Sequence, residues 1–201
     1  MKKENISNLF FLSGPQGAGK TTLAKKIAES DARIIIPELA THTPKFHTSP
    51  LQRITLKICQ RAIENYEAKE IAKRNPDKII LANRCIYDAQ AYAKAYWEMG
   101  LIYTEDLLKL SELQNAVFQK DSCAIIYNPP LETIQERLHS RWTNQEKKWR
   151  EDDPDYLRFS CKAFTELYSR VKEPNIFYTV TDPDLKEIIN WMYEECERRK
   201  K

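Results

Sequence analysis

The sequence predicts an α/β fold in three layers, in which a five-stranded parallel sheet lies between two layers of helices. Short apolar runs alternate along the chain with longer segments whose apolar residues recur at steps of three and four. The apolar runs are continuous, as in strands that are buried on both faces, and strand–helix alternation favours a parallel sheet. A length of 201 residues suits one core, so residues 1–201 are predicted to form a single domain.

The predicted strands are the short apolar runs. LFFLS leads directly into a glycine-rich turn, and CAIIY ends at Pro129-Pro130, where the chain loses the N–H groups that a ladder needs. RIII, KIILA and IFYTV are runs of the same kind. The five strands are therefore expected at residues 9–13, 33–36, 78–82, 123–127 and 176–180.

The predicted helices are the longer periodic segments between these strands. The second of them ends at Asn75-Pro76, and the third stops at Gly100, because proline and glycine terminate helices. Residues 143–153 show no core-facing pattern and are predicted to be a mobile polar loop. The helices are expected at residues 20–29, 51–73, 86–99, 105–118, 131–142, 155–172 and 185–199.

Composition excludes several classes of protein. A net charge of +3 is too small to indicate a nucleic-acid partner. No segment approaches the roughly 18–20 apolar residues of a membrane span, so no membrane association is expected. The five cysteines form no CxxC pair, which argues against a zinc or redox site and favours reduced thiols in the cytoplasm. A homodimer is left open.

A glycine-rich segment between the first strand and the first helix carries the strongest motif. Residues 14–21, Gly-Pro-Gln-Gly-Ala-Gly-Lys-Thr, fit G-x-x-x-x-G-K-[ST], the phosphate-binding P-loop. Three of the four glycines of the chain fall within this segment. The expected phosphate contacts come from Gly14, Pro15, Gln16, Gly17, Ala18, Gly19, Lys20, Thr21 and Thr22.

The chemistry of the motif predicts ATP and Mg²⁺ as cofactors. Glycines let the backbone wrap closely around a polyphosphate, and the helix N-terminus adds partial positive charge. Lys20 is expected to reach the β- and γ-phosphates, and the Thr21 hydroxyl to ligate Mg²⁺.

Beyond this loop, the layout of nearly the whole chain resembles the deoxynucleoside kinases and, less closely, thymidylate kinase. The matching features occur in the order of that family. They are the P-loop, Glu38 at the end of the second strand, Gln60-Arg61 on the second helix, Asn83-Arg84-Cys-Ile-Tyr87 after the third strand, and arginines with Tyr156-Leu157 near the lid.

The resemblance implies roles for residues near the acceptor. Glu38 would be the general base toward a substrate 5′-hydroxyl, as a carboxylate within reach of that proton can be. Arg84 would clamp the base glutamate and the substrate, and a guanidinium suits a carboxylate or phosphate. The family has an acid before this arginine, whereas this chain has Asn83; Asp88, one turn further, is a candidate replacement near the substrate.

Further implied positions complete the site. Gln60 would read the base through its amide, with Arg53 nearby in the same cleft. A lid at about residues 137–158 would supply cations that neutralise the transferred phosphoryl group, with Arg137, Arg141 and Arg150 as catalytic candidates beside Lys20, Glu38 and Arg84. The loop at residues 181–184 would lie against the adenine.

The predicted function is therefore an ATP-dependent kinase that transfers the γ-phosphoryl group to a small nucleoside-type acceptor. One alternative is a thymidylate or other nucleoside monophosphate kinase, whose acceptor phosphate needs extra cations and no strong base. Another is a different small-molecule kinase, such as a ribosylnicotinamide-type enzyme. The last is an ATP-binding regulatory module without transfer activity, which Asn83 in place of an acid favours.

Overall fold

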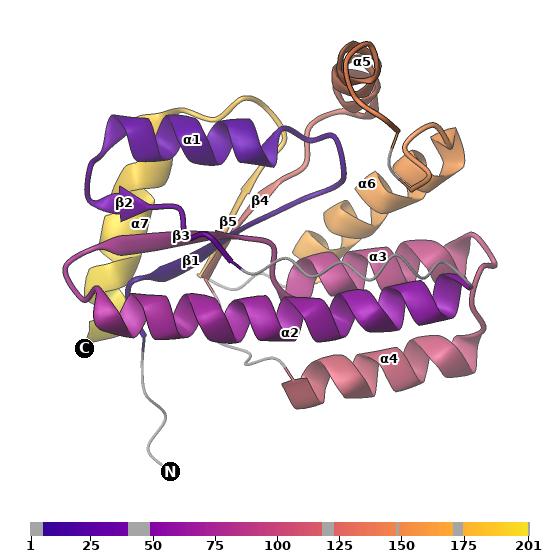
Figure 1. Ribbon diagram of the computed structural model, residues 1–201, viewed down its shortest axis with the longest axis horizontal. Helices are drawn as coiled ribbons and strands as arrows, with labels where there is room; N and C mark the ends of the chain where they lie inside the picture. The colour runs from indigo at the N-terminus through magenta and orange to yellow at the C-terminus, as the bar shows by residue number, and fades with distance from the viewer. Residues whose placement is uncertain (1–5, 40–48, 118–122, 148, 171–174, 201) are drawn as a thin grey trace.

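The sheet has the predicted strands and the predicted direction. The computed structural model describes residues 6–39, 49–117, 123–147, 149–170 and 175–200. Five strands form one sheet in the order β2-β3-β1-β4-β5, and every neighbouring pair is parallel (Figure 1). The strands are β1 (Leu9–Ser13), β2 (Ile34–Ile35), β3 (Ile79–Asn83), β4 (Cys123–Tyr127) and β5 (Ile176–Thr179).

The helices also follow the prediction closely. Residue 118 of the fourth predicted helix and residues 171–172 of the sixth lie outside the described residues. Among the described residues, no helix combines the length and apolarity that a membrane span requires. The helices are α1 (Lys20–Ser30), α2 (Pro50–Arg74), α3 (Ile86–Glu98), α4 (Thr104–Val117), α5 (Leu131–Trp142), α6 (Pro154–Arg170) and α7 (Leu185–Lys200).

Two apolar cores lie on the two faces of the sheet. Along β1, Leu9 and Phe11 pack in the core that α2, α3 and α6 cover, whereas Phe10 and Leu12 pack in the core beneath α1 and α7. Because the central strands β1, β3 and β4 are buried on both faces, their residues are apolar without alternation. This arrangement explains the continuous apolar runs of the sequence.

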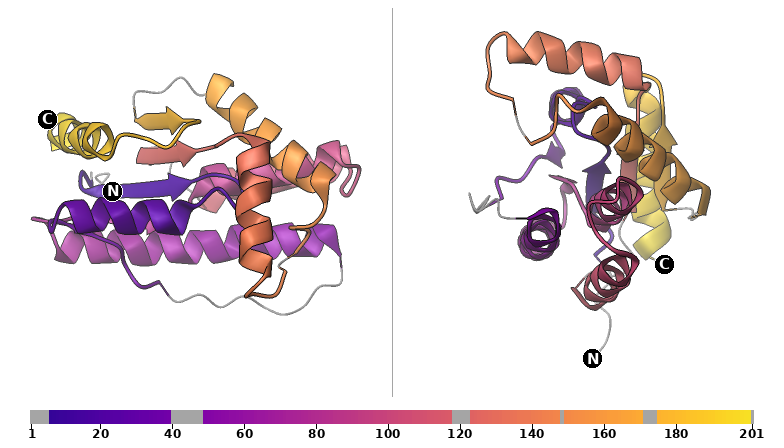
Figure 2. Two further views of the ribbon diagram at one scale, coloured as in Figure 1. Left: turned by 90° about the horizontal axis from the view of Figure 1, so that it is seen from above. Right: turned by 90° about the vertical axis from the view of Figure 1, so that its right-hand side faces the viewer.

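The carboxyl edge of the sheet carries the loops that can form a site. β1 lies between β3 and β4, so the chain connections diverge on either side of its carboxyl end. Open parallel sheets bind ligands at such a switch point. Helix α5 crosses this edge of the molecule, and the segment that follows it returns toward α2 (Figure 2).

Candidate active site

The P-loop connects β1 to α1 by a tight turn. Gly14 has φ +146°, and a Cβ at this position would lie 2.0 Å from the carbonyl oxygen of Tyr127. Only glycine permits this approach of the loop to β4. The loop thus has the close backbone wrap that the motif predicts.

Lys20 is buried at the start of α1 and points back across the loop. Its Nζ donates to the carbonyl oxygens of Gly14 at 2.7 Å and Pro15 at 2.8 Å. Burial, followed by the nearby Arg84 guanidinium, lowers the pKa of Lys20 to about 7. A polyphosphate would stabilise the charged form and so favour the ammonium.

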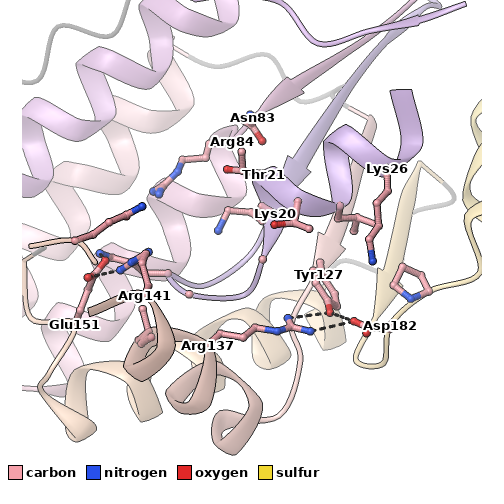
Figure 3. Close-up of a pocket in the computed structure, with 18 of the residues that line it drawn as sticks. Lys20, Thr21, Lys26, Asn83, Arg84, Tyr127, Arg137, Arg141, Glu151 and Asp182 are labelled. Atoms are coloured by element: carbon pink, nitrogen blue, oxygen red, sulfur yellow. Dashed lines mark hydrogen bonds and ion pairs between the residues drawn. The ribbon is translucent and has the colours of Figure 1, made fainter. Parts of the chain in front are cut away.

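A cavity of about 820 Å³ opens beside the loop (Figure 3). Of the predicted phosphate contacts, Gln16, Gly17, Gly19, Lys20, Thr21 and Thr22 line it, whereas Gly14, Pro15 and Ala18 do not. The cavity also contains the predicted lid cations Arg137 and Arg141, together with Asn83 and Arg84 from the end of β3 and Asp182 and Pro183 from the loop after β5. We call it the nucleotide cavity, after the ligand that is proposed for it below.

Arg137 joins three elements around this cavity. Its guanidinium donates to Tyr127 Oη at 3.0 Å, to Asp182 Oδ1 at 3.1 Å and to the carbonyl oxygen of Ala18. Tyr127 also donates to Asp182, and this bond, ahead of those from Arg137, lowers the pKa of the Asp182 carboxyl. Helix α5 is therefore tied to both the P-loop and the loop after β5.

Glu151 lies between the P-loop and the end of α5. Residues around it form turns, as the prediction of a loop over residues 143–153 requires, but Glu151 itself is fully buried. Gln16 donates to Oε1, Arg141 forms an ion pair with Oε2, and Trp142 Nε1 donates to Oε2 at 3.3 Å. Donors from distant parts of the chain compensate the burial of its charge.

A second, smaller cavity of about 60 Å³ adjoins the first. Gln16, Arg61 and Arg84 line both cavities, so the two meet beside the P-loop. Four cations line the second cavity together with aromatic rings, and we call it the acceptor cavity, after the role that is proposed for it below. Its cations are Arg53, Lys57, Arg61 and Arg84, and its rings are Tyr92, Tyr96, Trp149 and Tyr156.

The cations of the acceptor cavity repel one another. Burial and then the charges of Arg61, Arg84 and Arg53 lower the pKa of Lys57 to about 8. Burial and Arg84 likewise lower the pKa of Arg61, although Arg61 forms an ion pair with Glu64. An anion in this cavity would relieve the repulsion.

Arg84 and Asp88 are positioned by the turn from β3 into α3. Arg84 has φ +68°, a left-handed conformation that is uncommon outside glycine, and its N–H donates to Leu12 O at 2.9 Å. Asp88 is buried, and its Oδ2 accepts from Cys85 N at 2.9 Å and from Ser13 Oγ. The carboxylate thus caps α3 at the wall of the acceptor cavity.

Three of the residues predicted for catalysis or acceptor binding line neither cavity. Glu38 is exposed after β2. Gln60 is buried, and its Nε2 donates to Glu64 Oε1 at 2.9 Å. Arg150 forms an ion pair with Asp153 at 2.8 Å. Their functional roles stay predictions.

Lys57 is a cavity residue that the sequence reasoning missed. It lies midway between Arg53 and Arg61, and positions four apart share one face of a helix. The spacing 53, 57, 61 was therefore a signal for a cationic helix face directed at the site.

The residues at the P-loop also fit a magnesium ion. The Thr21 hydroxyl and the Asn83 amide line the nucleotide cavity, and Asn83 Oδ1 is buried without a hydrogen-bond partner among the described residues. Neutral oxygens and phosphate oxygens are ligands that Mg²⁺ accepts. Thr21 and Asn83 would hold the ion.

The architecture is similar to that of solved kinases. A deoxyadenosine kinase from M. mycoides with bound dATP matches with a TM-score of 0.69 and 15% identity, over 94% of this chain and 98% of that chain. Thymidylate kinase from Candida albicans matches with a TM-score of 0.65 and 17% identity, over 96% of this chain and 92% of that chain. At such identities the likeness shows the fold alone.

The fold and the phosphate-binding motif together define a P-loop protein whose architecture is similar to that of solved nucleoside and nucleotide kinases. The chain belongs to the AAA domain family, whose model matches residues 9–177. No curated protein sequence matches it.

Proposed function

We propose that this protein is an ATP-dependent phosphotransferase that acts on a nucleoside-type acceptor. The observation that carries the proposal is the meeting of the two cavities at Gln16, Arg61 and Arg84, next to the P-loop. A donor phosphate in one cavity and an acceptor in the other would be adjacent there. Positioning and neutralisation of charge account for most catalysis of phosphoryl transfer.

The donor side is argued from the P-loop. Loop amides and Lys20 would hold the triphosphate of ATP, and Arg137 and Arg141 would neutralise charge on the transferred group. The Mg²⁺ ion held by Thr21 would contribute further neutralisation of the phosphate oxygens. The loop that contains Asp182 and Pro183 would lie against the adenine.

The charge of the acceptor cavity favours a second candidate, an acceptor that already carries a phosphate. Four cations line this cavity, and Asp88 is the one acidic side chain that lines it among the described residues. Glu38, the proposed base for a hydroxyl acceptor, lines neither cavity. A phosphate oxygen needs no base, because it is ionised at neutral pH. The fold is compatible with both candidates, since the similar structures include a deoxyadenosine kinase and a thymidylate kinase.

The test is a panel of acceptors with radiolabelled ATP. Deoxynucleosides, ribonucleosides, their monophosphates and ribosylnicotinamide are compared at equal concentration. Phosphorylation of a nucleoside supports the first candidate, and preference for a monophosphate supports the second. ATP binding without turnover on any acceptor would support a regulatory module instead.

A pair of variants separates the two acceptor candidates further. Lys57 borders the acceptor cavity, whereas Lys73, on the same helix, forms an ion pair with Glu70. With a phosphate-bearing acceptor, Lys57→Gln is expected to raise the acceptor KM about tenfold, and Lys73→Gln to leave it within about twofold. A neutral nucleoside would show no such difference.

A further inference from the structure

The carboxylate of Glu151 occupies an unusual place for a charged group. Its side chain has 0% exposure and receives donors from two sides. Gln16 approaches from the P-loop, and Trp142 approaches from the last turn of α5. Arg141, from the same turn, is paired with Glu151 (Figure 3). A buried charge is costly unless it is paired, so removal of either partner would disturb the group.

Arg141 is only partly engaged by this contact. Its Nε is buried and has no hydrogen-bond partner among the described residues, although the guanidinium is paired with Glu151. Arg141 also lines the nucleotide cavity. A guanidinium has five N–H donors, so a carboxylate at one edge leaves donors for a phosphate.

We propose that Glu151 is a positioning residue, which holds the Arg141 guanidinium at the nucleotide cavity and ties α5 to Gln16 of the P-loop. The proposal rests on the proposed function, because it takes the ligand of Arg141 to be the terminal phosphate of the bound triphosphate. Glu151 itself touches no phosphate and acts through Arg141.

The same segment also reaches the acceptor cavity. The Trp149 ring lies 4.4 Å from the Arg53 guanidinium, and both side chains line that cavity. Glu151 is two residues further along the chain. The contact between Glu151 and Gln16 therefore holds Trp149, at the wall of the acceptor cavity, close to Arg141 in the nucleotide cavity. This connection would couple ligand binding in one cavity to ligand binding in the other.

The test measures how strongly the protein prefers a triphosphate to a diphosphate. Dissociation constants for ADP and for β,γ-imido-ATP, both with Mg²⁺, are measured on the full chain by calorimetry. Arg141→Ala and Glu151→Gln are each expected to reduce the preference for the triphosphate about tenfold. Because Glu151 acts through Arg141, the double variant should lose no more of the preference for the triphosphate than either single variant does.

Matched variants exclude a general structural effect. Glu146→Gln removes an exposed carboxylate from the same loop and should leave the preference unchanged. Glu151→Asp keeps the charge on a shorter side chain and should fall between wild type and Glu151→Gln, which provides a second reading if Glu151→Gln folds poorly.

The outcomes separate this inference from the proposed function. Absence of nucleotide binding in the wild type would overturn both. With wild-type binding intact, the inference alone is overturned in any of three cases: Arg141→Ala keeps the triphosphate preference, Glu151→Gln weakens ADP and the triphosphate equally, or Glu151→Gln lowers the preference further in the Arg141→Ala background.

Discussion

Lys20 Nζ donates to the carbonyl oxygen of Gly14 at 2.7 Å, so the side chain that would bind a triphosphate spans the loop and contacts its backbone. Phosphate oxygens would replace these carbonyl acceptors on binding. The exchange matters energetically because the lysine is buried and its pKa is lowered to about 7.

The first prediction concerns the pH dependence of nucleotide binding. Above about pH 7 the free protein holds Lys20 mainly uncharged, and a bound polyphosphate raises its pKa again. Binding should therefore take up a proton at pH 8, and affinity should fall as pH rises, by up to about tenfold per pH unit. Calorimetry in buffers of different ionisation enthalpy measures the uptake.

Lys20→Arg is the control for this prediction, because a guanidinium stays charged throughout the range. It should bind nucleotide without proton uptake at pH 8. The lowered pKa of Lys20 also makes the stability of the fold depend on pH. Between pH values of about 7, the pKa in the folded protein, and 10.5, the pKa in the unfolded chain, only the unfolded chain keeps the proton on Lys20. The contribution of Lys20 to the free energy of unfolding therefore rises with pH in this range. Absence of uptake in the wild type would contradict the lowered pKa.

The second prediction concerns Gly14. Gly14→Ala would place a Cβ 2.0 Å from Tyr127 O at φ +146°, so the loop must move away from β4. We expect a loss of about 2 kcal/mol or more in the free energy of unfolding, together with loss of ATP binding. Urea denaturation and calorimetry measure the two effects.

Gly100→Ala is the matched control, since Gly100 also has positive φ but its added Cβ would meet no atom within 4 Å. This substitution should lower the free energy of unfolding only by the backbone strain, about 1 kcal/mol, and leave ATP binding intact. If Gly14→Ala and Gly100→Ala lowered the free energy of unfolding and ATP binding equally, the contact of the Gly14 backbone with Tyr127 would not be the cause.

The third prediction concerns Asn83. Asn83→Asp would place a carboxylate where a buried amide oxygen now has no hydrogen-bond partner among the described residues. We expect the Mg²⁺ concentration needed for half-maximal ADP binding to fall about tenfold, because a carboxylate is the stronger magnesium ligand. Asn115→Asp, an exposed change on α4, should have no effect. An unchanged requirement for Mg²⁺ would place the ion away from Asn83.

The fourth prediction concerns the base. If the acceptor is a nucleoside hydroxyl activated by Glu38, Glu38→Gln should lower kcat about 100-fold while the Kd for ATP changes less than about twofold. Glu29→Gln, an exposed change at the end of α1, serves as the control. An unchanged kcat in Glu38→Gln would remove Glu38 from the mechanism and leave the phosphate-bearing acceptor as the simpler candidate.

Local patterns in the sequence determined the sheet, the helices and the P-loop. β1 is a continuous apolar run because it packs on both faces, and the loop after it needs glycine because the backbone passes against Tyr127. Apolar runs and glycine-rich motifs of this kind can be recognised from composition and spacing along the chain, although the contacts that require them come from distant segments.

Tertiary structure alone decided which charged side chains meet. Arg53, Lys57 and Arg61 share a face of α2, but only packing places that face against Arg84 after β3. Glu151 looked like a solvated loop residue, and its burial depends on a donor from Gln16, which lies 135 positions earlier. Contacts between distant segments leave no local pattern, because the free energy that holds them comes from the packed core rather than from adjacent residues.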